Sequence, residues 1–560
     1  MPMAGSEGWT GRAGRVTFNG VTATTDSAPS SPQNRPSAWA PLRHRVFFWL
    51  FLAQIASNVG SMMQSVGAAW LMGDLTTSPT LVALVQTATL LPVFLLGLPA
   101  GALADIFDRR RLLIVSQSWM LLTALWLAVL SFADLIAPWS LLFLTFSLGV
   151  GAALTLPAWQ AIQPELVPRA EFPQAVALGA LTFNLGRAIG PAVGGVIVAA
   201  AGPPWVFLLN AVSFLAVVAV LVRWRRRAAV STLPAETMAG AMRAGLRYGA
   251  NSRALRHVLI RSLTFVLPAG ALLSLLPVVA RDRLGLGSGG YGLLLACFGV
   301  GAALAAVLRP RIDAVLNPDR MVEVGTIVIA VVLLIDGLAT NQWVVGAGLF
   351  FGGGAWTLTF TTTNVAAQSA LPAWVRARGM GLFSLVTVGG LALGSALWGL
   401  VASRSLVGAQ VLAAVTLLVG GLATRRWRVS AFQHLDLSPA PSDDPIITLV
   451  PRPTDGPVLV SVTYQVPEAD MAEFTSTMRR VERQRRRTGA RRWGLYRDLA
   501  APDLVLEVFV VESWAEHLRQ HDRRTTTDLA ALDIVRPFVR GDVAVGHYVS
   551  AYSLADSDQP

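Results

Sequence analysis

Lysine is absent from this 560-residue sequence, and cysteine occurs only once, at Cys297. A single cysteine excludes a disulfide scaffold, a zinc site built from paired thiolates and cysteine-pair redox chemistry. Charged residues make up only 14% of the chain, against about 25% in soluble globular domains, and 53% of its residues are hydrophobic. This composition excludes a water-soluble globular protein and indicates a membrane protein.

The sequence signatures of common enzyme sites are also missing from the apolar part of the chain. It has no lysine-containing phosphate loop, no G-x-S-x-G turn and no histidine cluster with metal-ligand spacing. We therefore expect no enzyme activity, no cofactor and no metal there. The net charge of +12 would suggest a nucleic-acid partner in a soluble protein, but the arginines lie between apolar segments. Membrane topology accounts for the excess, and no nucleic-acid partner is expected.

Apolar stretches alternate with short polar joints between residues 46 and 424. Each stretch has at least roughly the twenty residues that a helix needs to cross the hydrocarbon core of a lipid bilayer. The sequence therefore predicts an all-α membrane part with twelve transmembrane helices. The expected spans are 46–73, 80–104, 112–133, 139–163, 174–201, 205–222, 257–281, 289–308, 321–340, 343–371, 379–403 and 406–424.

Arginine is distributed unevenly between the two ends of these spans. One end receives clusters at 109–111, 223–227 and 425–428 and single arginines such as Arg309, whereas the other holds little beyond Arg281, Arg283 and Arg404. Cytoplasmic loops of membrane proteins carry the excess of basic residues. We therefore expect a multi-pass protein of the cell membrane whose two termini and long central connection are cytoplasmic.

An internal repeat relates the two halves of the apolar region. Glycine-rich apolar helices could align in this way by chance, because membrane helices use small residues for packing. However, a single shift matches spans four and five to spans ten and eleven. This match indicates two halves of six helices, which is the parallel repeat of a transporter with a midplane cavity. At an offset of 204 residues the aligned pairs include Gly149 with Gly353, Thr155 with Thr359, Pro168 with Pro372, Gly186 with Gly390 and Gly195 with Gly399.

The end of the chain changes character. We expect strands at 457–466 and 504–511, weaker strands at 492–499 and 542–552, and helices at 468–487 and 514–535. This order predicts a small soluble α+β domain of the ferredoxin-like type. The expected divisions are a disordered cytoplasmic tail at 1–40, a first half at 41–222, a central loop at 223–256, a second half at 257–428, a linker at 429–455 and the cytoplasmic ferredoxin-like domain at 456–552.

The connection between spans two and three reads Gly101-Ala-Leu-Ala-Asp105-Ile-Phe-Asp108-Arg109-Arg110-Arg111. A glycine, three residues, an aspartate and a basic cluster resemble the signature loop of the major facilitator superfamily, which has a basic residue in place of Ile106 and a glycine in place of Asp108. The resemblance implies that Asp105 docks at the N-terminus of span eleven and latches the outward-facing state, while Arg109 and Arg110 pair with nearby carboxylates. The alternative is that the arginines only set the topology.

Span five contains the pattern G-x-x-x-G-P-x-x-G-G, which resembles the antiporter motif of the same superfamily. Its glycines permit close helix approach, and its proline removes a backbone donor and bends the helix, as rocking halves require. The family motif is associated with export, which favours outward transport by analogy, and a purely packing role is the alternative. The motif residues are Gly186, Arg187, Gly190, Pro191, Gly194 and Gly195.

Arg187 lies near the middle of span five, where a charge is costly unless it faces water or an anion. Nearby spans offer no acid at the same depth, since Asp74 and Asp134 lie near the outer ends and Asp336 is a lone acid late in span nine. Drug and proton antiporters of the superfamily often place an arginine in span four where this chain has Thr145, so the resemblance does not carry proton coupling with it. Arg187 could replace that buried charge, or it could hydrogen-bond helix carbonyls.

Two polar stripes are candidates for lining a cavity. Each has spacings of four, three and four residues, which places its members on one helix face. A polar stripe in lipid is costly, so these residues face either water or a neighbouring helix with which they hydrogen-bond, and both remain open. The stripes are Gln54, Asn58, Ser61 and Ser65 in span one, and Thr357, Thr361, Asn364 and Gln368 in span ten.

His517 and His521 lie one helical turn apart near the end of the chain and could ligate a metal, but no third ligand stands at a readable spacing. A solvated helix face is the favoured interpretation, so no metal is expected. The segment 512–521 and the strand order resemble the antibiotic-biosynthesis monooxygenase type of dimeric α/β barrel, which implies that this domain could dimerise.

The membrane part as a whole resembles the major facilitator superfamily, and in particular its enterobactin exporter branch. The resemblance implies a secondary active exporter of a small organic compound, drug-like or siderophore-like, that works by alternating access, with proton coupling left open. Uptake of a nutrient is one alternative. The other is a membrane-anchored enzyme or sensor that acts through the C-terminal domain.

Overall fold

The computed structural model of the chain describes residues 39–224, 238–430 and 451–551, together with position 37 and the linker positions 436–438, 440 and 447–449. The expected disordered tail at 1–40 and much of the 429–455 linker lie outside the described residues. Twelve described helices are long and apolar enough to cross a membrane, and each coincides with one expected span to within a few residues. The fold is mostly helical, with a small antiparallel sheet near the C-terminus.

Each half contributes six membrane helices. Proline stands in the first turn of several of them, where its missing N–H has no helical partner to lose. The first half contains α1 (Arg45–Leu75), α2 (Pro79–Ile106), α3 (Arg109–Phe132), α4 (Pro138–Leu166), α5 (Phe172–Ala201) and α6 (Pro203–Arg223). The second half contains α8 (Arg253–Val278) with its continuation η3 (Val279–Arg283), α9 (Ser288–Asp313), α10 (Pro318–Leu338), α11 (Gln342–Ser369), α12 (Arg376–Ala402) and α13 (Leu406–Ala423).

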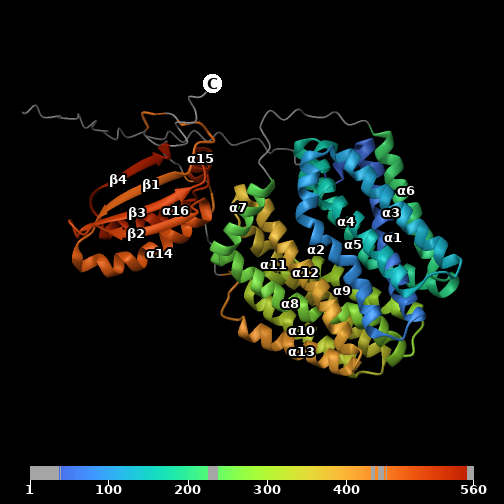
Figure 1. Ribbon diagram of the computed structural model, residues 1–560. Helices are drawn as coiled ribbons and strands as arrows, with labels where there is room; N and C mark the ends of the chain where they lie inside the picture. Colours follow the sequence, from blue (N-terminus) through green and yellow to red (C-terminus); the bar gives the residue numbers. More distant parts are fainter. Residues whose placement is uncertain are drawn as a thin grey trace, which may run out of the picture.

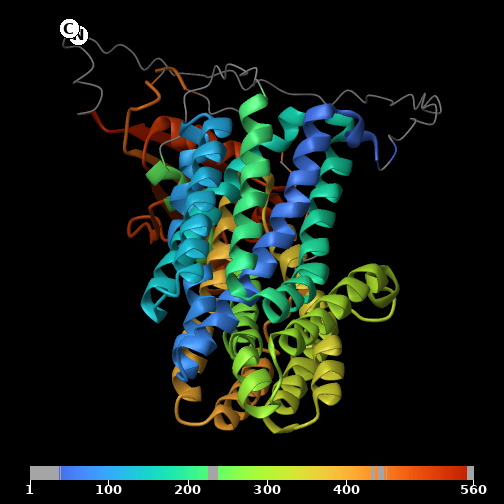
Figure 2. The same cartoon turned by 90° about the vertical axis from the view of Figure 1, so that its right-hand side faces the viewer.

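The central connection is more ordered than expected. It contains an additional helix, α7 (Met238–Asn251), which the sequence analysis treated as part of a plain loop. This helix packs against α12, where Gly245 approaches Arg378 and Gly249 approaches Leu382. Figures 1 and 2 show the two six-helix bundles, with α7 at the edge of the second one.

Four strands and three helices form a C-terminal unit over residues 451–551. The strand order β2-β3-β1-β4 is antiparallel throughout, with β1 in the centre, which is the topology of a ferredoxin-like fold. The elements are β1 (Val458–Gln465), α14 (Met471–Thr488), β2 (Arg492–Arg497), β3 (Leu504–Val511), α15 (Trp514–Asp522), α16 (Thr526–Asp533) and β4 (Arg540–Val549). The single helix expected at 514–535 is therefore two helices, because Asp528 accepts hydrogen bonds from the backbone and hydroxyl of Thr525 and starts a new one.

The C-terminal unit lies against the second half of the membrane part (Figure 1). Arg247 of α7 forms a 3.1 Å ion pair with Glu516 of α15. The guanidinium of Arg523 lies 4.6 Å from the ring centre of Trp374, in the short helix η4 (Ala373–Val375) before α12. Charged and aromatic side chains thus join α15 and its C-terminal end to α7 and to η4.

A buried ion pair holds the centre of the C-terminal unit. Glu507 of β3 is fully buried, and its carboxylate accepts hydrogen bonds from Arg485 at 3.0 Å, Trp493 at 2.9 Å and Tyr464 at 2.8 Å. Burial alone would raise the pKa of Glu507, but the charge of Arg485 and these hydrogen bonds outweigh it and lower the pKa below the usual 4.5. The ionised pair is therefore the stable form in the folded unit.

We predict that Glu507→Gln destabilises the C-terminal unit by about 3 kcal/mol, because it leaves the Arg485 cation buried without a counter-ion. Amide hydrogen exchange in β3 should become about a hundredfold faster. Since the folded pKa is lowered, the stability that Glu507 contributes is present at neutral pH and is lost as the pH falls below 4.5.

The control for this variant is Glu468→Gln, which breaks the exposed pair between Glu468 and Arg497 and should leave exchange in β3 nearly unchanged. Equal exchange rates in the two variants would contradict a stabilising role for the buried pair.

Candidate functional site

The glycines of the α5 motif lie at two helix contacts. A Cβ atom at Gly186 would lie 2.9 Å from the backbone of Asn58, and one at Gly194 would lie 2.8 Å from the Cα of Met63, so both face α1. A Cβ atom at Gly195 would instead lie 2.7 Å from the Cα of Gly292 in α9. The motif therefore places α5 directly between a helix of its own half and a helix of the other half.

Arg187 occupies the α5–α9 contact between the halves. A Cβ atom on Gly299 of α9 would lie 2.7 Å from the Arg187 carbonyl oxygen. The half-buried Arg187 side chain stacks beside Phe183, with 5.8 Å between guanidinium carbon and ring centre. Among the described residues, no hydrogen bond or ion pair neutralises its guanidinium. Such a cation inside a membrane protein marks a site for an anion or for water.

The stripe in α1 forms hydrogen bonds within its helix and across to α5. Gln54 donates to Asn58 at 3.1 Å, and Asn58 donates to Thr182 of α5 at 3.0 Å. Further along α1, the Ser65 hydroxyl donates to the Ser61 carbonyl at 3.0 Å. The interhelical alternative therefore applies to Asn58, whereas Ser65 is exposed and leaves the question of a cavity open.

The stripe in α11 is joined to an arginine that the sequence analysis assigned only to topology. The guanidinium of Arg309 in α9 donates to the Thr361 hydroxyl, and its second terminal nitrogen donates to Thr362 at 3.3 Å. Nearer the helix end, Gln368 donates to Asn364 at 2.7 Å. Thr357 of this stripe supplies its backbone carbonyl to Thr361. A second cationic group thus reaches the polar face of the second half.

The loop between α2 and α3 fastens the arginine-rich end of the first half, which is the end where the 109–111 and 223–227 clusters lie. Arg109 forms a 3.0 Å ion pair with Glu165 of α4. Arg110 donates to the carbonyls of Leu221 and Val222 at 2.8 and 2.9 Å, where a cation is favourable at the C-terminus of α6. Asp108, which replaces the family's glycine, caps α3 by accepting from the Arg111 backbone.

Gly101 and Asp105 lie in the last turns of α2, but their side chains fall outside the described residues. The carboxylate contact expected at the start of span eleven is therefore not among the described interactions. Arg109 and Arg110 bind acceptors in their own half, and the latch remains a prediction.

The two halves meet at the opposite, arginine-poor end. Arg281 of η3 forms an ion pair with Asp74 of α1, and its guanidinium carbon lies 5.2 Å from the ring centre of Trp70. Thr80 of α2 donates to the Gly399 carbonyl of α12 at 3.0 Å. In Figure 1 the bundles lie against each other at the lower, arginine-poor end and separate toward the upper one. The sequence places Asp74 and Arg281 at the same end of the membrane part, but no pattern in it pairs the two residues.

Two buried polar residues lie near the arginine-poor ends of α10 and α13. Asp336 and Gln410 are both fully buried, and their side-chain oxygens have no hydrogen-bond partner among the described residues. The next residue, Gly337, contacts Gln410 closely. Asp336 can be noticed in the sequence as a lone acid late in span nine, whereas no sequence pattern points to Gln410. A membrane-buried acid is a functional candidate by default, because its burial has no packing benefit.

The interpretation of His517 and His521 as a solvated helix face is wrong for His517. Its side chain is only 1% exposed, and a third histidine, His547 of β4, lies beside it. Spacing along the chain could not reveal this third residue, because β4 approaches α15 only in the folded unit.

We predict that Arg281→Ala favours separation of the halves at the arginine-poor end. The exposed ion pair and the contact with Trp70 together stabilise this closure by about 1 kcal/mol, so the open population should rise about fivefold. Spin labels on Thr77→Cys and Ser403→Cys, in a Cys297→Ser background, would report it as a longer distance.

The matched control is Arg283→Ala. It removes the same charge from the same turn, but Arg283 binds the carbonyls of Leu338 and Ala339 within the second half. If Arg281→Ala and Arg283→Ala give the same distance distribution, the Asp74 ion pair does not control closure.

Comparison with known proteins identifies a family and several relatives that share this architecture. Residues 36–554 match the major facilitator family described as transmembrane secretion effector, a range that includes the C-terminal unit. The staphyloferrin A transporter of Staphylococcus aureus is 25% identical over 288 residues, covering 51% of this chain and 72% of its own. The enterobactin exporter EntS of Salmonella choleraesuis is 26% identical over 359 residues, covering 64% and 85%.

Solved structures agree on the fold. A bacterial homologue of the lysosomal transporter Spinster superposes with a TM-score of 0.54 at 14% identity, covering 69% of this chain and 96% of its own. The nucleoside transporter NupG superposes with a TM-score of 0.56 at 12% identity, covering 68% and 99%. With the twelve membrane helices and the contacts between the two halves, the match over residues 36–554 shows that the chain belongs to the transmembrane secretion effector family of major facilitator transporters.

Proposed function

We propose that the chain exports a small anionic organic compound of the siderophore class by alternating access. The observation that carries this proposal is Arg187, whose backbone lies at the α5–α9 contact and whose guanidinium has no neutralising partner among the described residues. Two relatives carry siderophore names, one a staphyloferrin A transporter and one an enterobactin exporter. An anion bound at Arg187 would supply the missing counter-charge, and it would lie where the moving halves meet.

The arginine distribution supports an orientation with both termini in the cytoplasm. In that orientation the Asp74–Arg281 contact would lie outside and would close the outer end, as in an inward-facing transporter. Export would then begin from this state. A solute enters from the cytoplasm, reaches Arg187, and leaves once the outer ends separate and the arginine-rich ends close.

Asp336 is our candidate for proton coupling. It is a fully buried acid without a hydrogen-bond partner among the described residues, whereas Thr145 stands where related antiporters have an arginine. A carboxyl group in that position can release a proton only when the surroundings admit water or a cation. A change of state that hydrates the α10–α13 contact would therefore couple proton release to movement of the halves.

The C-terminal unit supports the proposed division of the chain at 429–455, since it has its own apolar core. Its topology and the 512–521 segment resemble the antibiotic-biosynthesis monooxygenase type of α/β barrel, in which pairs of chains associate. We assign it no catalytic role and infer that it serves the transporter in the cytoplasm, with dimerisation as a further property to test.

Inverted membrane vesicles test the direction of transport and the role of Arg187 together. Vesicles that contain the parent chain should accumulate radiolabelled enterobactin-type siderophores when a proton gradient is imposed. Arg187→Ala should reduce accumulation to background at an equal protein level, because a small residue fits the glycine-lined contact, and Arg187→Lys should restore it only partly.

Arg311→Ala is the matched control, because Arg311 is an exposed arginine of α9 and its loss should leave transport unchanged. Normal transport by Arg187→Ala would refute the anion site. Accumulation only in right-side-out vesicles would favour nutrient uptake, and an inserted parent chain without transport in either orientation would favour an enzyme or sensor.

The latch proposal concerns Asp105. An aspartate at the end of α2 can dock on the free N–H groups at the start of α12 only while the cytoplasmic ends are together. We predict that Asp105→Asn weakens the outward-open state by about 1–2 kcal/mol. Spin labels at the arginine-rich ends of α2 and α12 would then show a larger long-distance population.

Asp108→Asn is the control for this variant. It removes one charge from the same loop, but asparagine still caps α3. Identical distance distributions in Asp105→Asn and the parent would show that the loop does not latch.

A further inference from the structure

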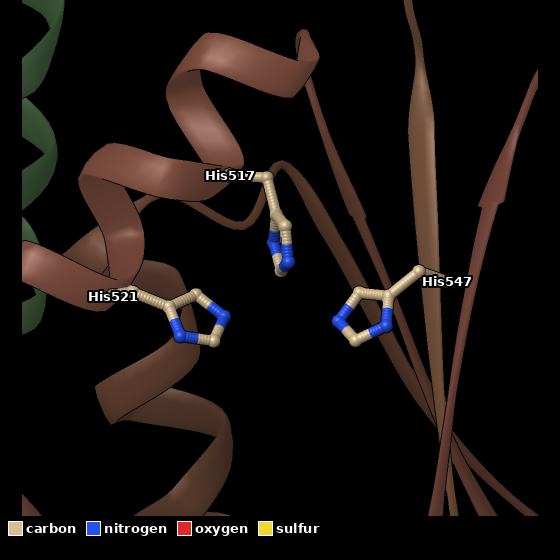
Figure 3. A group of neighbouring side chains, drawn as sticks. All are labelled: His517, His521 and His547. Atoms are coloured by element: carbon tan, nitrogen blue, oxygen red, sulfur yellow. The ribbon is translucent and has the colours of Figure 1, made fainter. Parts of the chain in front are cut away.

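Three histidines of the C-terminal unit converge from two elements. His517 and His521 project from α15, and His547 projects from near the C-terminal end of β4, opposite Val460 of β1. One nitrogen from each ring lies within 4.8 Å of the other two. The ring centre of His517 lies 4.7 Å from that of His521 and 4.9 Å from that of His547. Figure 3 shows the rings turned toward the space between them.

His517 is the residue that packing alone does not explain. It is 1% exposed, and neither of its ring nitrogens has a hydrogen-bond partner among the described residues. The nearby Gln520 amide donates instead to Arg485 and Thr488. A buried imidazole with both nitrogens unsatisfied loses about 1–3 kcal/mol for each lost partner unless something else occupies that position. A leucine at this position would fill the core without leaving any polar atom unsatisfied.

We propose that His517, His521 and His547 bind one divalent transition-metal ion of the zinc class. Imidazole nitrogen is a preferred ligand of Zn²⁺, Ni²⁺ and Cu²⁺, and three histidines with an open fourth position form an established type of zinc site. Ligand nitrogens in a tetrahedral zinc site lie about 3.4 Å apart, given zinc–nitrogen bonds of about 2.0–2.1 Å. The ring nitrogens would have to move about 1 Å closer to one another to reach this separation. Side-chain rotations can provide that movement, because His521 and His547 are half-exposed and have room to turn.

An ion in this position would tie α15 to β4. Glu516, the residue before His517, forms the ion pair with Arg247 that joins the unit to α7. The proposed metal therefore fixes the helix that carries the contact with the membrane part. The site uses no residue of the proposed transport path, so its failure and the failure of the export proposal are distinguishable.

The test uses the full-length chain, purified without a histidine tag and freed of metal with a chelator. Titration with Zn²⁺ should show one equivalent bound per chain by calorimetry. Co²⁺ should give the intense visible absorption of a tetrahedral site. His521→Ala and His547→Ala should each weaken Zn²⁺ binding at least about tenfold, because each removes one of three ligands.

His257→Ala is the matched control, since His257 lies in α8 at the membrane part and should leave binding unchanged. Because His517→Ala could unfold the buried position, the half-exposed His521 and His547 carry the test, with hydrogen exchange in β3 as the check on folding. Absence of a stoichiometric site in the parent would overturn the proposal. So would equal Zn²⁺ affinity in the parent and both variants, or equal weakening in His257→Ala.

Discussion

Close approach of backbones at glycine joins the two halves of this transporter. At the α5–α9 contact, Gly195 and Gly292 lie so near that a single Cβ atom on either would meet the partner backbone at under 3 Å. Lipid is as apolar as a leucine side chain, so the hydrophobic effect does not drive this contact, and packing and polar contacts must hold it. A contact made of backbones without interlocking side chains can also slide and separate, as movement of whole bundles requires.

The arginines of the membrane part also depend on polar contacts, because lipid offers no partner for a guanidinium. Arg110 and Arg283 lie at the C-terminal ends of α6 and α10, where free carbonyls accept their hydrogen bonds, and Arg281 reaches across to an aspartate. These positions satisfy the guanidinium with groups that helices leave free at their ends. Arg187 differs, because it lies within a helix and at the contact between the halves. That difference, rather than its charge alone, makes it the residue around which we build the transport proposal.

The membrane helices could be predicted from sequence because length and apolar composition decide whether a segment spans a bilayer. The helix α7 could not, because its 14 residues are too few to span a bilayer and include three glycines, which disfavour a helix. The glycine motif was found, but its two different partners were not, since one is in α1 and the other is in α9. The same holds for Arg281 with Asp74, which are separated by 207 positions, and for His547, which reaches α15 through the register of β4 on β1. Local patterns thus indicate which residues are unusual, whereas their partners depend on how distant elements come together.

The attachment of the C-terminal unit has a mechanical consequence. Its contacts through Glu516 and Arg523 both fall on the second half, at α7 and at the start of α12. The C-terminal unit is attached to one of the two bundles and lies outside both of them. It therefore moves with that bundle when the bundles rock. A rotation of a few degrees that shifts helices only slightly at the α5–α9 contact displaces the far edge of the sheet much further. The distance between the sheet and the first half should therefore change during the transport cycle. A pair of fluorophores, one on the sheet and one on the first half, would report that change.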